Sequence, residues 1–288
     1  MGILPQLVLN SVIAGATYAL VAISFNFIYS TTKFFNLAHG VIATIGGYMV
    51  FYFSKILGLD ICIAVFLGVI FAGIIGFSLD KMIYLPLRKR KASNMVLLIA
   101  SLGAMTTLQA IIAILFSSRF KTLLESNDTQ KIFTILGGVI TQTQLIILLS
   151  TALIVVGFAF FFYKTQFGKI VRAISDDEEV ARIIGIDTNK IISYVFFIGS
   201  AIIGLTGILV GFDVGIEPTM GLNLLLKGVI ASIVGGVGNI YGGILGAFLL
   251  GFAENFGIWK ISGEWKDAIA FMLLIIFLVF RPRGIMNK

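Results

Sequence analysis

The chain has 288 residues, of which 58% are apolar and only 12% are charged, and its mean hydropathy is +1.05. Soluble domains are about 45–50% apolar and about 25% charged, so this composition excludes an ordinary soluble domain and indicates a polytopic membrane protein. The net charge of +7 does not point to nucleic acid, because lysines and arginines collect in the cytoplasmic loops of membrane proteins.

Apolar segments recur along the chain with lengths that suit membrane-spanning helices, which need about 20 apolar residues. The first segment follows no basic region and precedes no small-residue cleavage site, so we expect it to stay as a spanning helix rather than a removed signal peptide. The fold class is therefore all-α, with about eight or nine transmembrane helices and glycine-rich broken or re-entrant segments. The predicted spans are 6–29, 37–54, 61–79, 95–116, 143–163, 191–212, 222–235, 240–258 and 267–280.

Basic residues set the expected orientation. They are concentrated in the loops 80–94 and 164–190 and in the tail after 280, which the positive-inside rule places in the cytoplasm. Residues 117–142 and 213–221 then lie outside. Counting back through three spans puts the N-terminus outside as well, unless 37–54 is re-entrant.

Residues 175–187, SDDEEVARIIGID, form a highly charged island between two apolar segments. Ser175 and Glu178 match a capping box, in which each side chain accepts a hydrogen bond from the backbone N–H of the other residue. The acids at 176–179 suit the positive end of a helix dipole, and Gly185 suits the left-handed position that ends a helix. The stretch predicts a short helix over about 176–184, capped at both ends.

This helix lies in a connection, 164–190, of about 27 residues, whereas a turn between membrane helices needs only a few. The helix carries a charged face and a small apolar face formed by Val180, Ile183 and Ile184. One interpretation is a solvated connector that only reverses the chain. The other is docking to a soluble partner, which the length and the two faces favour.

Four elements, in order, carry a resemblance to a known family. Along the chain they are Phe35–Gly40 (FNLAHG), Gly168–Ile174 with Glu179–Asp187, Lys227–Asn239 with Gly242–Ala247, and Arg281–Gly284 (RPRG). Together they resemble the branched-chain amino acid permease family of ABC importers. The short chain and the NLAHG form are similar to the smaller of the two permease types that pair in one transporter.

The resemblance implies one transmembrane permease domain over 1–288, in the inner or plasma membrane of a prokaryote, with 164–190 as the loop on which an ATPase docks. It implies four kinds of partner: a paralogous permease forming a heterodimer, two ABC ATPase subunits, an extracytoplasmic substrate-binding protein and membrane lipid. No nucleic-acid partner is expected. The expected ATPase-docking residues are Gly168, Arg172, Ala173, Asp176, Glu179, Ala181, Arg182 and Gly185.

The chain lacks the motifs of an ATPase or another enzyme. A P-loop requires G-x-x-x-x-G-K-[ST], but Gly168-Lys169 is preceded by Tyr163 at the first glycine position and followed by Ile170. The single histidine, His39, has no further ligands spaced for a metal site. We therefore expect no enzymatic activity, no metal and no cofactor in this chain, with ATP used by partner subunits.

The translocation pathway is expected where helices are interrupted. Helix ends and carbonyls exposed by breaks can hold a zwitterionic substrate, and the glycines at 46–47 and 235–238 are the best candidates for such breaks. An ionisable residue at membrane depth is a functional-site hypothesis, although headgroup water around Glu254 and a buried structural role for His39 are alternatives. The predicted pathway residues are Asn36, His39, Gly46, Gly47, Gly235, Gly236, Gly238, Asn239 and Glu254.

Two other transport functions remain open from the sequence. A urea or short-amide permease of the same family would share the fold and the loop. A secondary transporter driven by an ion gradient could use Glu254 or His39 as a relay, but it would leave the capped helix at 176–184 unexplained.

Overall fold

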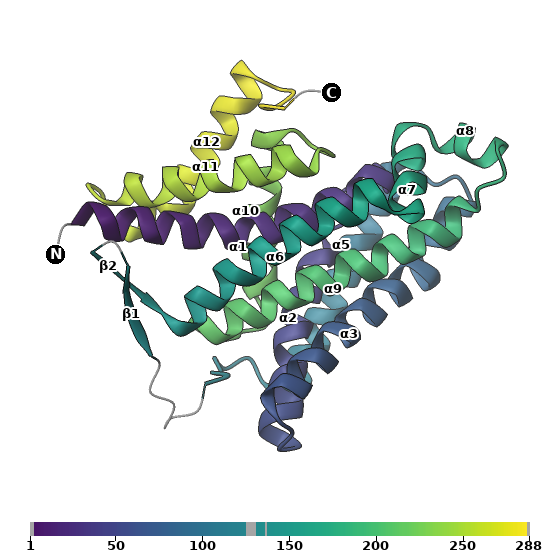
Figure 1. The fold of residues 1–288 in the computed structure, drawn as a ribbon. Coiled ribbons are helices and arrows are strands. Elements are labelled where there is room, and N and C mark those ends of the chain that lie inside the picture. The colour runs from purple at the N-terminus through teal and green to yellow at the C-terminus, as the bar shows by residue number, and fades with distance from the viewer. Residues whose placement is uncertain (1–2, 125–130, 136, 287–288) are drawn as a thin grey trace. The chain divides into compact units, whose positions relative to one another are not determined.

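The computed structural model describes residues 3–124, 131–135 and 137–286 (Figure 1). The helices and strands follow one another in this order: α1 (Ile3–Thr32), α2 (Ala38–Phe51), π-helix η1 (Tyr52–Ile56), α3 (Ile61–Leu79), π-helix η2 (Asp80–Tyr84), α4 (Leu85–Lys89), α5 (Asn94–Phe116), β1 (Ile132–Ile135), β2 (Gly138–Thr141), α6 (Gln142–Lys164), α7 (Gln166–Asp176), α8 (Glu178–Ile183), α9 (Thr188–Val214), α10 (Met220–Gly235), α11 (Ile240–Ile258), 3₁₀-helix η3 (Gly263–Trp265) and α12 (Lys266–Phe280).

The all-α polytopic membrane fold predicted from composition is confirmed. Within the described residues, six helices are long and apolar enough to cross a membrane: Ile3–Thr32, Ile61–Lys89, Asn94–Phe116, Gln142–Lys164, Thr188–Val214 and Ile240–Ile258. The predicted segments at α2, α10 and α12 are also helical but have only 14, 16 and 15 residues. The expected eight or nine crossings are therefore not confirmed.

The predicted loop 80–94 is mostly wrong. The helix that starts at Ile61 continues through η2 and α4 to Lys89, and α5 begins at Asn94 with Ser93 as its N-cap. Pro86 has no N–H for a helical hydrogen bond, and the preceding turn widens to the π-helix η2. The polar and basic residues of this stretch predict a loop. Instead, Asp80 and Arg88 lie on the helix and form a largely buried ion pair with each other at 2.7 Å.

A short β-hairpin interrupts the predicted outer loop 117–142. Strands β1 and β2 pair antiparallel, with Ile132 opposite Thr141 and Ile135 opposite Gly138. The Gln6 side chain accepts from the N–H of Val139 at 2.7 Å and donates to its carbonyl at 3.0 Å, which ties the outer edge of β2 to the start of α1.

The chain divides into two compact units. Unit 1 comprises residues 1–26, 124–154 and 226–288, and unit 2 comprises residues 27–123 and 155–225. Because of these boundaries, α1, α6 and α10 each have residues in both units.

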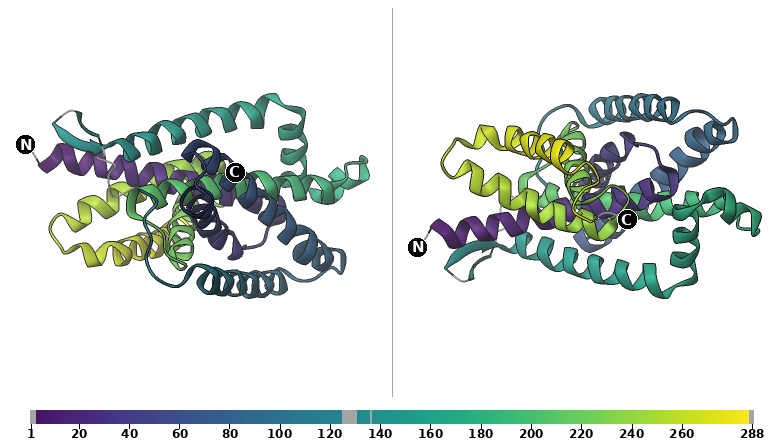
Figure 2. Two further views of the ribbon diagram at one scale, coloured as in Figure 1. Left: turned by 90° about the horizontal axis from the view of Figure 1, so that it is seen from below. Right: turned by 90° about the horizontal axis from the view of Figure 1, so that it is seen from above.

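Unit 1 is built on close packing of small residues. Its core contains Tyr18, Leu250 and a set of alanines from α1, α10, α11 and α12, namely Ala19, Ala22, Ala231, Ala247 and Ala270. A β-carbon on Gly251 would lie 2.6 Å from the carbonyl oxygen of Ser11, so α11 and α1 approach each other backbone to backbone. Helices α11 and α12 pack side by side (Figures 1 and 2). Small residues permit such approach between membrane helices.

Unit 2 is centred on α2, α3 and α9. Helix α2 is buried along nearly its whole length, and it packs on both α3 and α9. A β-carbon on Gly207 of α9 would collide with the carbonyl of Ala43 in α2. These three helices therefore pack tightly against one another and form the centre of unit 2.

Candidate functional site

The connection between α6 and α9 is largely helical, and we call residues 165–187 the α7–α8 segment (Figure 1). Thr165 is the N-cap of α7 and accepts from the N–H of Gly168 at 3.0 Å. A β-carbon on Gly168 would lie 2.7 Å from the carbonyl oxygen of Phe161, so only glycine fits the turn from α6. Helix α7 buries Gly168, Val171 and Ile174, and its other faces remain partly or fully exposed.

Arg172 holds α7 against the end of α6. Its guanidinium lies 4.9 Å from the ring centroid of Tyr163 and 5.6 Å from that of Phe162. Cation–π contacts of this kind contribute about 0.5–1 kcal/mol at exposed sites and more when desolvated. Arg172, predicted as an ATPase-docking residue, is thus also a structural anchor of the α7–α8 segment.

The predicted capping box of Ser175 and Glu178 is wrong. Helix α7 extends through Asp176, so Ser175 lies in its last turn, and Asp177 caps the next helix instead. Asp177 has an extended backbone, and its Oδ1 accepts from the N–H groups of Glu179 and Val180 at 2.8 and 3.1 Å. Aspartate is as good an N-cap as serine, and because α7 extends through Asp176, Asp177 is the residue positioned to cap α8.

The predicted stop at Gly185 is confirmed. Gly185 has a φ of +88°, the N–H of Gly185 donates to the carbonyl of Arg182, and the N–H of Ile186 donates to that of Ala181. This pair of bonds is the Schellman motif, which satisfies the last carbonyls of a helix. The Asp177 side chain therefore fixes the start of α8, and the backbone turn at Gly185 fixes its end.

A polar triangle of Glu178, Arg182 and Thr188 closes the loop between α8 and α9. The Oε1 of Glu178 accepts from Arg182 at 2.7 Å and from the Thr188 hydroxyl at 3.1 Å. Thr188 is buried, and Asp187 caps α9 by accepting from the N–H of Lys190. Glu178 was not among the predicted site residues, although its spacing of four from Arg182 is a recognisable helical pair.

The surface of α8 combines charge with exposed apolar side chains. Val180, Ile183 and Ile184 are 52%, 83% and 68% exposed, while Ala181 is buried beneath them. Aliphatic side chains exposed together on a rigid helix are typical of interaction sites. We call these three residues the α8 apolar tip. Of the predicted docking residues, Ala173 is half-buried, whereas Asp176, Glu179 and Arg182 are exposed.

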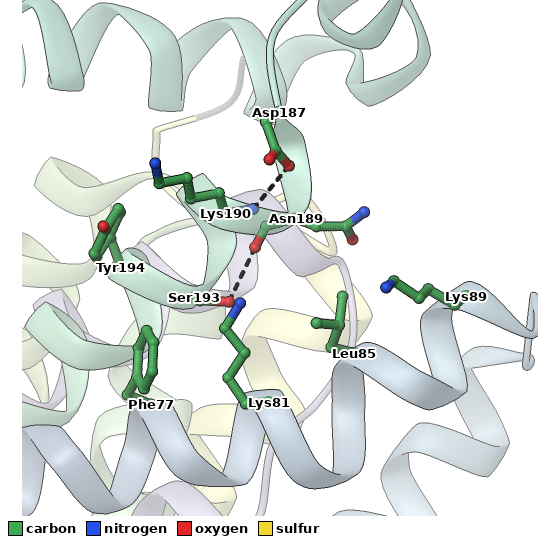
Figure 3. A pocket seen from close by; sticks show the side chains of 9 residues that line it. All are labelled: Phe77, Lys81, Leu85, Lys89, Asp187, Asn189, Lys190, Ser193 and Tyr194. Atoms are coloured by element: carbon green, nitrogen blue, oxygen red, sulfur yellow. Dashed lines mark hydrogen bonds between the residues drawn. The ribbon is translucent and has the colours of Figure 1, made fainter.

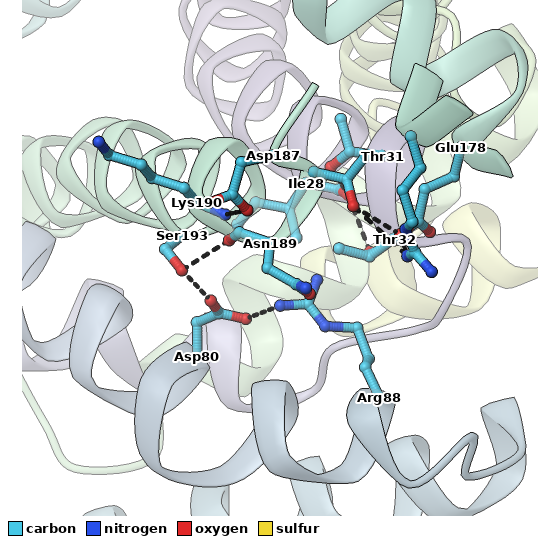
Figure 4. Close-up of polar contacts among 12 residues, drawn as sticks. Ile28, Thr31, Thr32, Asp80, Arg88, Glu178, Asp187, Asn189, Lys190 and Ser193 are labelled. Carbon is cyan, nitrogen blue, oxygen red and sulfur yellow. Dashed lines mark hydrogen bonds and ion pairs between the residues drawn. The ribbon is translucent and has the colours of Figure 1, made fainter. Parts of the chain in front are cut away.

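A second polar network, which the sequence did not predict, joins α9 to the α3–η2–α4 helix (Figure 4). Asp80 is fully buried; its Oδ1 lies 2.7 Å from Arg88 Nη2 and its Oδ2 accepts from the Ser193 hydroxyl at 2.6 Å. Nearby in sequence, the Tyr84 hydroxyl donates to Asn36 Oδ1 at 2.8 Å. The network connects the start of α9 to the end of the helix that begins at Ile61.

The connection between the first two predicted spans, 6–29 and 37–54, is present between α1 and α2. Helix α1 ends at Thr32 and α2 begins at Ala38. Asn36 lies in the connection and His39 in the first turn of α2, and both are buried. Their role in a translocation pathway stays a prediction.

The predicted break at Gly46–Gly47 is wrong. Helix α2 runs unbroken through both glycines. A β-carbon on Gly46 would lie 2.5 Å from the carbonyl oxygen of Gly204, and one on Gly47 would lie 2.9 Å from Ile216. These glycines therefore serve close packing of α2 and expose no helix end.

The predicted break between α10 and α11 is present, but backbone N–H groups near the end of the chain bond to the carbonyls at the end of α10. Asn239 caps α11 by accepting from the N–H groups of Tyr241 and Gly242. The N–H groups of Ile285 and Met286 donate to the carbonyls of Val234 and Gly235 at 2.9 Å each. Gly236 and Gly238 adopt φ values of +118° and +83°, which permit this turn. The tail that follows the RPRG motif thus occupies carbonyls that we expected to face a substrate.

Glu254 is fully buried in unit 1 and is paired. Its Oε1 lies 2.6 Å from the ammonium of Lys227, and its Oε2 accepts from the Tyr18 hydroxyl at 2.7 Å. Lys227 also pairs with the exposed Asp267 at 2.7 Å. The alternative that placed the Glu254 carboxylate in headgroup water is therefore wrong. Among the described residues, no group of three or more metal-binding side chains occurs.

Comparisons with known proteins identify the family that the chain resembles. A family model described as "Branched-chain amino acid transport system / permease component" matches residues 7–278. The chain is 34% identical to the high-affinity branched-chain amino acid transport system permease protein BraD of Pseudomonas aeruginosa, over 98% of this chain and 95% of that protein. It is 31% identical to the corresponding LivH protein of Escherichia coli K12, with the same coverage of 98% and 95%.

Among solved structures, the chain is similar to PsaBC from Streptococcus pneumoniae in complex with Fab. The TM-score is 0.53 at 16% sequence identity, and the match covers 98% of this chain and 93% of that chain. At this identity the likeness shows a shared fold and nothing finer.

Proposed function

The chain belongs to the branched-chain amino acid transport permease family, and from that membership we propose that it is the membrane subunit of an ATP-driven importer for branched-chain amino acids. The substrate class comes from these relatives, which are named as branched-chain amino acid transport permeases. In this proposal a paralogous permease completes the pathway, two ATPases bind on the cytoplasmic side, and an extracytoplasmic binding protein delivers the substrate.

The observation that supports ATPase docking is the α8 apolar tip. Its three side chains are exposed on a helix whose two ends are fixed by Asp177 and Gly185. A rigid helix with an apolar tip and charged flanks suits insertion into a groove on a soluble protein. Burying an aliphatic side chain contributes about 1.5–3 kcal/mol, so a few of them suffice for a stable contact.

The proposed route of transmission runs from α8 through the start of α9. Glu178 and Thr188 join α8 to α9, and Ser193 on α9 bonds to Asp80. Because α9 packs tightly on α2 and α3, a displacement of α8 by the closing ATPases would move these helices together. Access to the pathway would then switch from outside to inside.

The test is uptake of labelled leucine by proteoliposomes that contain the permease with its co-expressed partner subunits and binding protein. We expect uptake that requires ATP and is outcompeted by excess leucine but not by excess urea. No uptake of labelled leucine, together with ATP-dependent uptake of labelled urea by the same proteoliposomes, would favour a urea or short-amide permease. Uptake driven by a proton or sodium gradient without ATP would refute the importer and favour a secondary transporter.

A further inference from the structure

A cleft of about 450 Å³ opens in unit 2 between the end of the α3–η2–α4 helix and the start of α9 (Figure 3). Phe77, Lys81 and Lys89 line it from the first helix, and Lys190 and Tyr194 line it from α9. The cleft lies at the end of these helices that carries the basic residues, which the positive-inside rule assigns to the cytoplasmic face.

The rim of the cleft has an excess of positive charge. Lys81, Lys89 and Lys190 are exposed, and within the described part of the chain none of their ammonium groups forms an ion pair. The one carboxylate in the lining, Asp187, accepts a hydrogen bond from the backbone N–H of Lys190 as the cap of α9. The lining therefore holds three cations and one anion, whose carboxylate already accepts a bond, and this excess of positive charge suits a phosphate-like ligand.

One end of the cleft, at Phe77 and Tyr194, is aromatic and continues into an apolar surface (Figure 3). The rings of Phe77 and Tyr194 lie 6.4 Å apart. From Phe77, steps of three or four residues lead back along α3 to Ile74 and Phe66, which are 47% and 65% exposed. Residues at this spacing share one helix face. A single stripe thus changes from apolar along α3 to basic at Lys81.

We propose that this cleft binds the phosphodiester headgroup of an anionic phospholipid, with an acyl chain lying along the Phe66–Phe77 stripe of α3. Basic pockets between membrane helices on the cytoplasmic side suit such headgroups. Free phosphate would use the lysines but not the stripe, and the acidic surface of a docked protein would do the same. Because the lysines come from both helices, a bound phosphate would tie α4 to α9 beside the Asp80–Ser193 contact.

The test compares phospholipid binding to the full-length permease in mild detergent, measured by native mass spectrometry as phosphatidylglycerol is titrated. The cleft variant is Lys81→Gln/Lys89→Gln/Lys190→Gln. The matched control, Lys91→Gln/Lys164→Gln/Lys169→Gln, removes the same charge from exposed lysines on the same side that do not line the cleft. Each lysine near an anionic surface contributes about 1 kcal/mol, so we expect affinity to fall on the order of 100-fold in the cleft variant and less than about threefold in the control.

Two further arms separate the possible ligands. Phosphatidylcholine, which has the same chains but no net charge, is expected to bind the cleft weakly, and millimolar inorganic phosphate is expected not to displace phosphatidylglycerol. Equal binding by the cleft variant and wild type would overturn the proposal. Displacement by inorganic phosphate would reduce the cleft to a free-anion site. Loss of ATPase co-purification in the cleft variant with unchanged lipid binding would assign the lysines to a protein contact instead.

Discussion

Removal of the Asp80 carboxylate is the sharpest perturbation of the network that joins α9 to the α3–η2–α4 helix. In Asp80→Ala, Arg88 loses the carboxylate oxygen 2.7 Å from its Nη2, and Ser193 loses the acceptor 2.6 Å from its hydroxyl. The Arg88 side chain is only 13% exposed, and its Nε and Nη1 already have no hydrogen-bond partner among the described residues. The variant therefore leaves a mostly buried cation without its hydrogen-bonded carboxylate, and the charge of Glu178 is its remaining anionic neighbour.

The expected cost follows from that burial. Breaking a buried ion pair by deleting one partner destabilises by about 3–5 kcal/mol, because the other charge is left uncompensated. For a chain of this size the loss corresponds to a fall in melting temperature on the order of 10 °C. Ser193→Ala removes one hydrogen bond and keeps the ion pair, so its cost is expected to be about 1–3 kcal/mol.

Thermal unfolding of the detergent-purified permease, followed by an intrinsic-fluorescence shift, measures these differences. The double variant Asp80→Leu/Arg88→Met replaces both charges by apolar groups, and we expect it to recover most of the stability lost in Asp80→Ala. If Asp80→Ala lowers stability by less than about 1 kcal/mol, or if the effects of removing Asp80 and Arg88 simply add, then Arg88 is solvated and the reasoning fails.

Three further predictions follow from other contacts. Gly185→Val forces a branched residue into a φ of +88° and is expected to cost about 1–3 kcal/mol locally, seen as faster proteolysis within 165–190 with little change in global melting. Glu254→Ala leaves Lys227 without its buried partner and is expected to lower the melting temperature, whereas Glu254→Leu with Lys227→Met restores it; melting curves of the two variants decide this. Gly207→Val places side-chain atoms on the carbonyl of Ala43, so we expect loss of monodisperse protein in size-exclusion chromatography, and an unchanged elution profile would show that α2 and α9 can separate.

The sequence predicted those features that depend on local chemistry. Long apolar runs are helices because a lipid environment requires internal backbone hydrogen bonding. Gly185 ends α8 because the left-handed conformation strongly favours glycine, and the predicted span 240–258 coincides with α11. Each of these signals lies within a few residues of the element that it controls.

Features that depend on distant neighbours could not be predicted. The sequence around Gly46 does not distinguish a glycine that breaks a helix from one that allows a neighbouring helix to approach closely. The contact with the carbonyl of Gly204, 158 positions away in the chain, shows that Gly46 has the second role. Ser175 and Asp177 are both acceptable caps, and the length of α7 chose between them. The sequence places Arg88 in the predicted loop 80–94. Nothing local shows that the helix continues past Leu79, or that Asp80, eight positions earlier, is the buried partner of Arg88.

The central claim, that the α8 apolar tip holds the ATPase, is tested most directly by co-purification of the ATPase with tagged permease. Ile183→Asp changes a side chain that is 83% exposed, and Val214→Asp makes a comparable change at a side chain that is 62% exposed at the far end of α9. Because burial of an isoleucine contributes about 1.5–3 kcal/mol, we expect Ile183→Asp to weaken ATPase retention at least about tenfold and Val214→Asp to leave it unchanged. Equal retention by both variants and wild type would contradict the account.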